Sequence, residues 1–227
     1  MRLNSIFLSI TKINYQEKYK NLSMKKQLII LFCLFSVLSF SQKNNDSILA
    51  ENKEYRANLN EYYADSTHSP LTNEARKEFD SIPFFPIDTA YYVVAKFVRI
   101  KRGEKFKMKT STTRQPEYKV FGKAVFTIRD TIYELMIYQN VNLTKKEGYE
   151  DFLFLPFNDY TNGNKTYGGG RYLDLLIPDG DTIILDFNKA YNPYCAYTYG
   201  YSCPVPPKEN SIATYIRAGV QYVGEEH

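Results

Sequence analysis

The chain has 227 residues, of which 44% are hydrophobic and 24% are charged, a composition typical of a globular protein. Residues 1–41 hold six Lys and Arg against one Glu, so the remaining chain has 23 of the 29 basic and 24 of the 25 acidic residues. A net charge near zero lacks the positive footprint of nucleic-acid-binding proteins, which excludes that class of function.

A secretory signal peptide is predicted over residues 24–41. Met24 is followed by two lysines, an apolar run over residues 28–40 and a serine directly before Gln42, which is the order of segments in such a leader. The apolar run is shorter than the roughly 20 residues that a membrane-spanning helix needs. Residues 1–23 lack this pattern and are interpreted as an upstream extension from a wrongly chosen start codon; an uncleaved N-terminal anchor is the alternative.

Cleavage leaves residues 42–227 as a single β-rich domain, expected in the periplasm or elsewhere in the cell envelope, with no transmembrane segment. Apolar residues at helical spacing predict a helix over residues 46–64 at its beginning. Thr72 is expected to cap a short second helix that runs through Phe79.

The spacing of apolar residues changes from helical to alternating after Pro86, which predicts strands in the rest of the domain. Seven strands are expected, over residues 91–100, 106–112, 118–128, 131–140, 152–156, 172–177 and 182–187. Turn residues between the first and second, third and fourth, and sixth and seventh strands predict three hairpins. A short closing helix over residues 207–218 completes a mainly β (α+β) fold, an antiparallel barrel or sandwich.

The last of these hairpins is predicted to bring polar side chains together. With a two-residue turn, Arg171, Asp186 and Asn188 lie on one face of the paired strands, within reach of one another. A one-residue bulge would instead pair Asp174 with Asp186. The cluster is a structural salt bridge, a ligand-binding Arg–Asp pair or an acid–base site.

Three glycines precede Arg171. Gly168, Gly169 and Gly170 allow positive φ and a close approach of the backbone to another group. Their amides, beside the guanidinium, can hold a carboxylate or a phosphate; the alternative is a tight loop that only leads into a strand. The nearby Gly-Asn-Lys-Thr run lacks the spacing of a P-loop, so a nucleotide is not expected.

Cys195 and Cys203 are the only cysteines after residue 41, and they are expected to form a disulfide in an oxidising compartment. The only histidines are His68 and His227, so a metal site or a thiolate nucleophile has few residues to draw on. No metal and no cofactor are therefore expected.

The Tyr-rich loop, residues 191–201, contains five tyrosines. Rigid rings with polar tips suit a sugar, an aromatic ligand or a protein interface. They suit equally a loop that has no other means of burying itself.

Three motifs in the second half of the domain resemble a known family. They read Asp-Tyr-Thr-Asn-Gly-Asn-Lys-Thr-Tyr-Gly-Gly-Gly-Arg-Tyr-Leu-Asp from Asp159, Leu-Asp-Phe-Asn-Lys-Ala-Tyr-Asn-Pro-Tyr-Cys from Leu185, and Cys-Pro-Val-Pro-Pro-Lys-Glu-Asn from Cys203. Over about residues 48–220 the chain resembles the bacterial domain of unknown function family 1684. The resemblance implies a bacterial protein with one mainly β domain, and it carries no established activity, substrate or cofactor. It places the family signature on Asp159, Thr161, Gly163, Thr166, Tyr167, Gly168, Gly170, Arg171, Asp186, Asn188, Asn192, Cys195, Cys203, Pro204, Pro207, Glu209 and Asn210.

Three functions are compatible with these features. The first is an exported protein that binds a small polar or anionic ligand. Its ligand-binding residues would be Arg171, Asp186, Asn188, Asn192, Gly168, Gly169, Gly170, Tyr167 and Asp159. The second is a hydrolase with Asp186 or Glu209 as its acid–base group. The third is an interaction module that meets a partner through the Tyr-rich loop.

Overall fold

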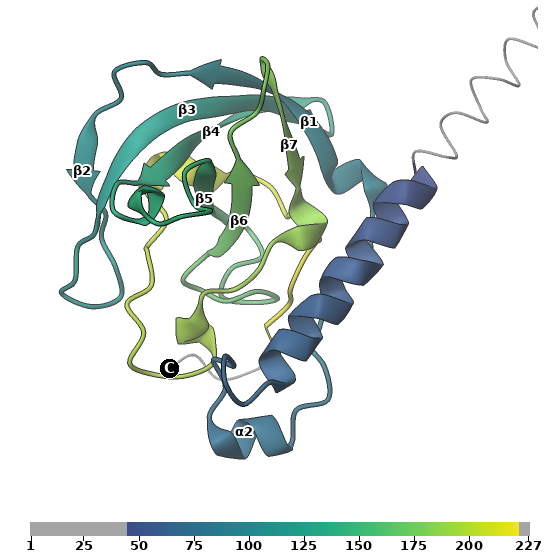
Figure 1. Ribbon diagram of the computed structural model, residues 1–227. Coiled ribbons are helices and arrows are strands. Elements are labelled where there is room, and N and C mark those ends of the chain that lie inside the picture. Colours follow the sequence, from purple (N-terminus) through teal and green to yellow (C-terminus); the bar gives the residue numbers. More distant parts are fainter. Residues whose placement is uncertain (1–44, 223–227) are drawn as a thin grey trace, which may run out of the picture. The chain divides into compact units, whose positions relative to one another are not determined.

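The computed structural model describes residues 45–222 (Figure 1). The signal peptide predicted over residues 24–41 and the extension over residues 1–23 lie outside the described residues. The strands and the 3-10 turns all belong to the unit Ile48–His227, one of two into which the chain divides.

The domain begins with helices, as predicted. A helix over residues 45–64 is followed by α2 (Asn73–Lys77), whose N-cap Thr72 accepts a 3.1 Å hydrogen bond from the Ala75 amide. The remaining helices are single 3-10 turns: η1 (Thr89–Tyr91), η2 (Leu143–Lys145), η3 (Phe187–Lys189), η4 (Tyr194–Ala196) and η5 (Lys208–Asn210). Within residues 45–222, no helix has the length and apolar character to cross a membrane.

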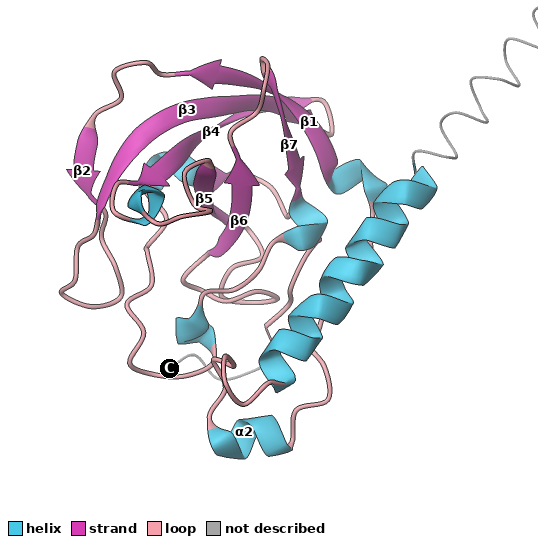
Figure 2. Cartoon of the chain, in the orientation of Figure 1, coloured by secondary structure: helices cyan, strands magenta, loops and turns pink. Residues whose placement is uncertain are grey.

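Eight strands form one sheet that curls into a half-barrel (Figures 1 and 2). They are β1 (Tyr92–Arg99), β2 (Lys105–Lys107), β3 (Glu117–Ile128), β4 (Thr131–Asn140), β5 (Phe152–Asp159), β6 (Arg171–Leu176), β7 (Thr182–Asp186) and β8 (Ser211–Ile212). The order is β6-β5-β4-β3-β1-β7, with β2 paired to β3 and β8 to β5. Every pairing is antiparallel except that of β8 with β5. The mainly β fold is therefore confirmed, and its barrel is only half closed.

The β3–β4 hairpin follows directly from the local sequence. Its two turn residues, Arg129 and Asp130, both have positive φ, at 48° and 66°, which is the backbone twist that a tight hairpin requires. A bulge between Val120 and Gly122 bends the long strand β3. This bend helps the sheet to curl around its core.

Alternating side chains of the strands fill the concave interior. Phe157 of β5 and Phe187 of η3 meet edge to face there, with ring centroids 5.3 Å apart, and Ala95 and Ile137 are fully buried beside them. A second cluster, built around Tyr118, Tyr138, Phe154 and Tyr172, lies apart from this core.

Two of the predicted hairpins are wrong, although their strands exist. β1 pairs with β3 and β7, whereas β2 pairs with β3. β6 pairs with β5 over six residues, and β7 pairs with β1. Turn residues predict only that the chain reverses direction. Which strand pairs with which depends on distant strands whose apolar faces fit together.

The closing helix expected over residues 207–218 is wrong beyond its first turn. The chain forms η5 and then runs extended through β8, parallel to β5. The Asn210 side chain fixes this path, because it donates to the carbonyls of Met136 and Pro156 and accepts from the Met136 amide. These three bonds tie the segment to β4 and β5, which a continuous helix would prevent.

Candidate functional site

Arg171 lies at the start of β6, and its side chain is completely buried. Its guanidinium donates to Asp159 Oδ2 at 2.7 Å, to the Ile216 carbonyl at 2.8 Å and to the Ala218 carbonyl. The prediction that Arg171 meets Asp186 and Asn188 is wrong, because β6 pairs with β5 and not with β7. Burial lowers the pKa of Arg171, and the Asp159 carboxylate opposes that shift.

The partner of Arg171 is equally enclosed. The Asp159 side chain is 0% exposed, and its Oδ1 also accepts from the amides of Thr161 and Ile216. The pair thus ties the end of β5, the start of β6 and the segment of Ile216 and Ala218 to one another. Neither side chain has a surface that a ligand could contact.

Two of the three glycines, Gly169 and Gly170, lie close to protein groups, whereas Gly168 is exposed. Gly170 has a φ of 89°, and a Cβ there would lie 2.5 Å from Pro206 and 2.7 Å from the Asn158 side chain. At Gly169 a Cβ would collide with the Tyr167 ring, which itself packs on Tyr222. The close approach that the glycines permit is therefore an approach to the domain's own chain.

Asp186 and Asn188 belong to a separate buried network. Asn52, on the helix over residues 45–64, donates to Asp186 Oδ2 at 2.7 Å, and the amide and side chain of Asn188 donate to Asp186 Oδ1. Asn188 also exchanges two bonds with the Asp88 backbone. This network holds the first helix and the η1 region against the end of β7.

The remaining predicted residues lie apart. Asn192 is completely buried and donates to the Gln221 carbonyl at 3.2 Å. Glu209 accepts a 3.0 Å bond from the Tyr138 hydroxyl and lies on η5, whereas Asp186 ends β7. The two candidate acid–base groups of the hydrolase hypothesis therefore belong to different networks.

An aromatic pocket of about 300 Å³ opens elsewhere, between the sheet and the loop that follows β7. The aromatic pocket is lined by Tyr118, Phe152, Phe154, Tyr172, Asp174, Tyr191, Pro193, Tyr194, Tyr201, Ser202, Cys203 and Pro204. Alternation along β5 and β6 places these rings on one face of the strands. Phe154 and Tyr172 pack at 4.8 Å, and Tyr191 stands perpendicular to Tyr172.

Asp174 provides the charge of this pocket. Of the described residues that line it, only Asp174 is charged, and the Tyr191 hydroxyl donates to its Oδ1 at 2.7 Å. Desolvation by the surrounding rings raises the pKa of Asp174 to about 6, and the Tyr191 bond opposes that rise. The residue remains exposed at the rim, so the carboxylate faces the open pocket.

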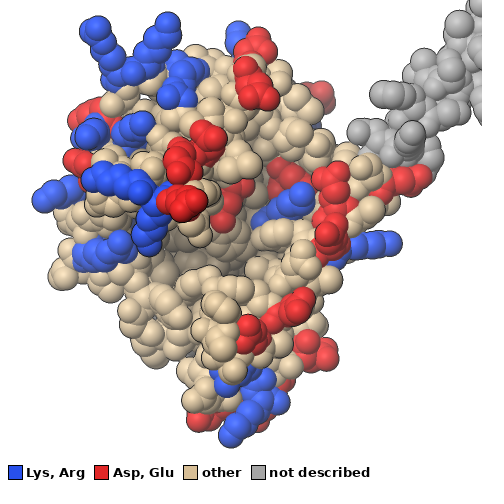
Figure 3. All heavy atoms as spheres, in the orientation of Figure 1, with Lys and Arg blue, Asp and Glu red and all other residues tan. Residues whose placement is uncertain are grey.

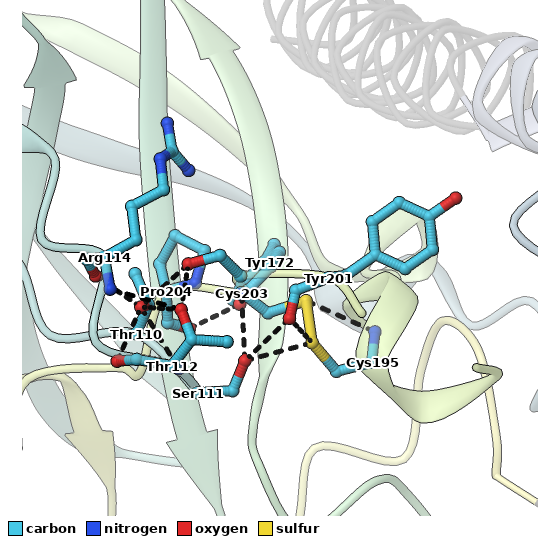
Figure 4. Close-up of a disulfide and its surroundings, with 10 residues drawn as sticks. Thr110, Ser111, Thr112, Arg114, Tyr172, Cys195, Tyr201, Cys203 and Pro204 are labelled. Atoms are coloured by element: carbon cyan, nitrogen blue, oxygen red, sulfur yellow. Dashed lines mark hydrogen bonds between the residues drawn. A yellow bond between two sulfur atoms is a disulfide. The ribbon is translucent and has the colours of Figure 1, made fainter. Parts of the chain in front are cut away.

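The Tyr-rich loop forms the outer wall and is firmly held. The Sγ atoms of Cys195 and Cys203 lie 2.24 Å apart, at disulfide distance, as expected (Figure 4). Ser111 accepts from the Cys203 amide at 3.1 Å and donates to the Tyr201 carbonyl at the same distance. Tyr191, Tyr194 and Tyr201 line the pocket, whereas Tyr197 packs against Tyr63.

Sequence reasoning found the Tyr-rich wall, but it named Asp174 only as an alternative partner of Asp186 and missed the rings opposite that wall. Asp174 lies between two leucines in β6, two positions after Tyr172. A lone carboxylate within an apolar run is a usable signal. The side chains of Tyr118 and Phe154 join the site only through the pairing of distant strands, which the local pattern does not encode.

Comparison with known proteins gives a family and a fold. A family model described as "Protein of unknown function (DUF1684)" matches residues 77–221, more than half of the chain. An uncharacterised protein of Haloarcula marismortui, with a solution NMR structure, is 30% identical and superimposes with a TM-score of 0.63. The match covers 79% of this chain and 96% of that one. No curated protein matches the chain.

Proposed function

Because the chain belongs to the DUF1684 family of proteins of unknown function, we propose from its own geometry that it is an exported protein that binds a small organic cation in the aromatic pocket. The observation that carries the proposal is the Asp174 carboxylate, the one charged lining group in the described part of the chain. The ligand site thus moves from the buried Arg171 network, where the sequence suggested an anion, to an exposed acidic one.

The chemistry of the walls favours a cation with an apolar body. Seven of the twelve lining residues are Tyr or Phe, and an ammonium group is attracted to the faces of such rings. Asp174 carries its charge above pH 6, where it offers a direct ion pair to the same ammonium group. An anion would meet the opposite field and find no Lys or Arg among these residues.

The volume of the aromatic pocket limits the size of the ligand. Pockets for small organic molecules begin at about 300 Å³, and the aromatic pocket has this volume. A single-ring amine fits such a space, whereas a nucleotide or an oligosaccharide would extend far beyond it.

Calorimetric titration with phenethylamine, paired with its neutral analogue 2-phenylethanol, tests the proposal. The amine is expected to bind about tenfold more tightly, the effect of one ion pair or cation–π contact worth about 1.4 kcal/mol. Asp174→Asn should remove that preference. Asp179→Asn is the matched control, because Asp179 is also exposed on the β6–β7 connection but does not line the pocket. Equal weak binding of both compounds to all three proteins would contradict the assignment.

Export rests on the predicted leader and is supported by the cysteine pair, since disulfides persist in oxidising compartments. Mass spectrometry of the protein from the native envelope fraction should find Gln42 at the N-terminus. A chain that retains residues 24–41 would favour an anchor instead.

Hydrolysis is the second candidate, and one observation favours it at the same place. A carboxyl group whose pKa is raised to about 6 inside a pocket can exchange protons near neutral pH, as an acid–base catalyst does. Asp174 is therefore a better catalytic candidate than Asp186 or Glu209. An activity screen of the purified protein against ester and amide substrates, with Asp174→Asn as control, decides between binding and turnover.

A further inference from the structure

The curled sheet ends in two strands that are neighbours in the chain but not in the hydrogen-bond order. β6 and β7 lie at opposite ends of the order β6-β5-β4-β3-β1-β7, although only residues 177–181 connect them. The half-barrel thus has an open seam, with one edge strand on each side (Figure 2).

The hydrogen-bond pattern shows which backbone groups face the seam. The Tyr172 amide bonds to the Tyr191 carbonyl, away from β5, so alternation along β6 directs the amides and carbonyls of Asp174 and Leu176 to that same outer edge. On β7, the Asp181 carbonyl accepts from Phe97 of β1. The backbone groups of Thr182 and Ile184 therefore face away from β1 and toward the seam.

Tyr191 shows that this edge accepts a further strand. It exchanges two backbone bonds with Tyr172, at 2.9 and 3.1 Å, and so occupies the first position of the β6 edge. The edge beyond it carries neither Pro nor Lys, two common protections against pairing, and its one exposed charge is Asp174. Leu176 and Ile184, 67% and 47% exposed, remain uncovered there.

A groove of about 420 Å³ runs between the two edges. Its walls come from both strands, with Leu173 and Leu175 on one side and Ile183 and Ile184 on the other. Both edges therefore border one continuous apolar channel.

The charge at the seam is acidic. Asp174 lies in the groove, and Asp179 and Asp181 are exposed on the connection at its end. Among the described residues that line the groove, Lys189 is the one basic side chain, and it is near Glu51 and Asp186. Lys and Arg gather instead over β2 and β3, whereas Asp and Glu predominate along the first helix (Figure 3).

The geometry points to β-strand addition: an extended segment of a partner protein, with alternating apolar and basic side chains, inserts between β6 and β7 and closes the barrel. Main-chain bonds to Asp174, Leu176, Thr182 and Ile184 supply the affinity, and apolar side chains on alternate positions enter the groove. Basic side chains on the other positions meet the carboxylates at the seam. This surface shares Asp174 with the aromatic pocket, but its main-chain pairing does not depend on the ligand proposed there.

A capped heptapeptide, Lys-Val-Lys-Val-Lys-Val-Lys, is the probe, titrated into the ¹⁵N-labelled protein. Amide shifts and slowed hydrogen exchange are expected at Leu176 and Ile184, with matching changes at Asp174 and Thr182. Two further peptides of the same charge, N-methylated at every Val or at every Lys, lose the donors of one edge each. Both should bind at least tenfold more weakly, because the inserted strand pairs on both sides.

Two variants provide the matched test in the protein. Ile184→Lys places a positive charge on the seam edge, and Ile132→Lys makes the same change on the β3–β4 hairpin, at a residue that is 70% exposed against 47% for Ile184. The first should weaken peptide binding at least tenfold, and the second should leave it unchanged. Equal binding of the methylated peptides, equal effects of the two variants or shifts confined to other surfaces would overturn the proposal. Self-association at the same amides without peptide would assign the seam to a second copy and overturn it as well.

Discussion

Asp159 and Asp174 lie on neighbouring strands, and each accepts a side-chain hydrogen bond of 2.7 Å, yet their surroundings differ completely. Asp159 is paired with a guanidinium, and both side chains are 0% exposed. Asp174 is paired with the neutral hydroxyl of Tyr191 at the rim of an open pocket. A buried carboxylate that is paired with a guanidinium has its charge neutralised and cannot attract a ligand. A carboxylate that is bonded to a neutral phenol at the surface keeps its negative charge and can attract one.

This comparison separates residues that hold the domain together from residues that can bind. Arg171, Asp159, Asp186 and Asn188, all predicted as site residues from the sequence, have buried protein partners. The open, titratable site falls on Asp174, which was not among the site residues predicted from the sequence. A high density of polar residues in a sequence therefore indicates a buried structural network as readily as it indicates a binding site.

The largest expected effect is that of Arg171→Ala. It leaves the Asp159 carboxylate buried without its cation, which costs about 3–5 kcal/mol of the free energy of unfolding. Lys105→Ala removes an exposed pair with Glu117 and should cost less than about 1 kcal/mol. Urea denaturation measures both.

A paired replacement sharpens this test. Arg171→Met combined with Asp159→Leu removes both charges and should recover only part of the loss, because apolar residues can replace the buried ion pair but not its hydrogen bonds to the backbone of Thr161, Ile216 and Ala218. A cost below about 1 kcal/mol for Arg171→Ala alone would show that the pair is dispensable to the scaffold.

The second effect concerns the wall of the aromatic pocket. Replacing both Cys195 and Cys203 by Ser should cost about 2–3 kcal/mol, because the loop that they close is short and removes limited entropy from the unfolded chain. Phenethylamine affinity should fall as well, since Tyr194 and Tyr201 lose their anchor. Free-thiol labelling of the unfolded, unreduced protein is the control: two reactive thiols would refute the bridge.

Local pattern was sufficient for most of the fold. The limits of β3 and β4, the turn at Arg129 and Asp130 and the cap at Thr72 all follow from neighbouring residues. Pairings between distant strands do not follow from neighbouring residues. For this reason β6 and β7 border an open seam, where the sequence predicted a hairpin. The predicted partner of Arg171 is wrong for the same reason, because it depends on that hairpin.

The third effect tests the hydrogen bond that holds Asp174. Tyr191→Phe removes one partly exposed bond and should lower stability by about 1 kcal/mol. Because this bond stabilises the ionised carboxylate, its loss should raise the pKa of Asp174 further above 6. Titration of the side-chain ¹³C resonance of Asp174 in both proteins measures the change; an unchanged or lower pKa would mean that the bond does not form in solution.

The smallest effect on stability, and the most direct test of the pocket, is the pH dependence of Asp174→Asn. The pKa of Asp174 is about 6 in the folded protein, against an ordinary value of about 3.9 in an unfolded chain. Between these pH values the folded state binds more protons, so the stability of the natural protein falls as pH rises from about 4 to about 6. The Asn variant lacks this titration and should gain relative stability over the same window, by less than about 1 kcal/mol because water screens the exposed carboxylate. Phenethylamine binding should show the opposite trend, because the amine pairs with the ionised carboxylate of Asp174. Its affinity should rise through pH 6 in the natural protein and stay level in the variant. Parallel pH profiles of the two proteins, in melting and in phenethylamine binding, would remove Asp174 from both roles.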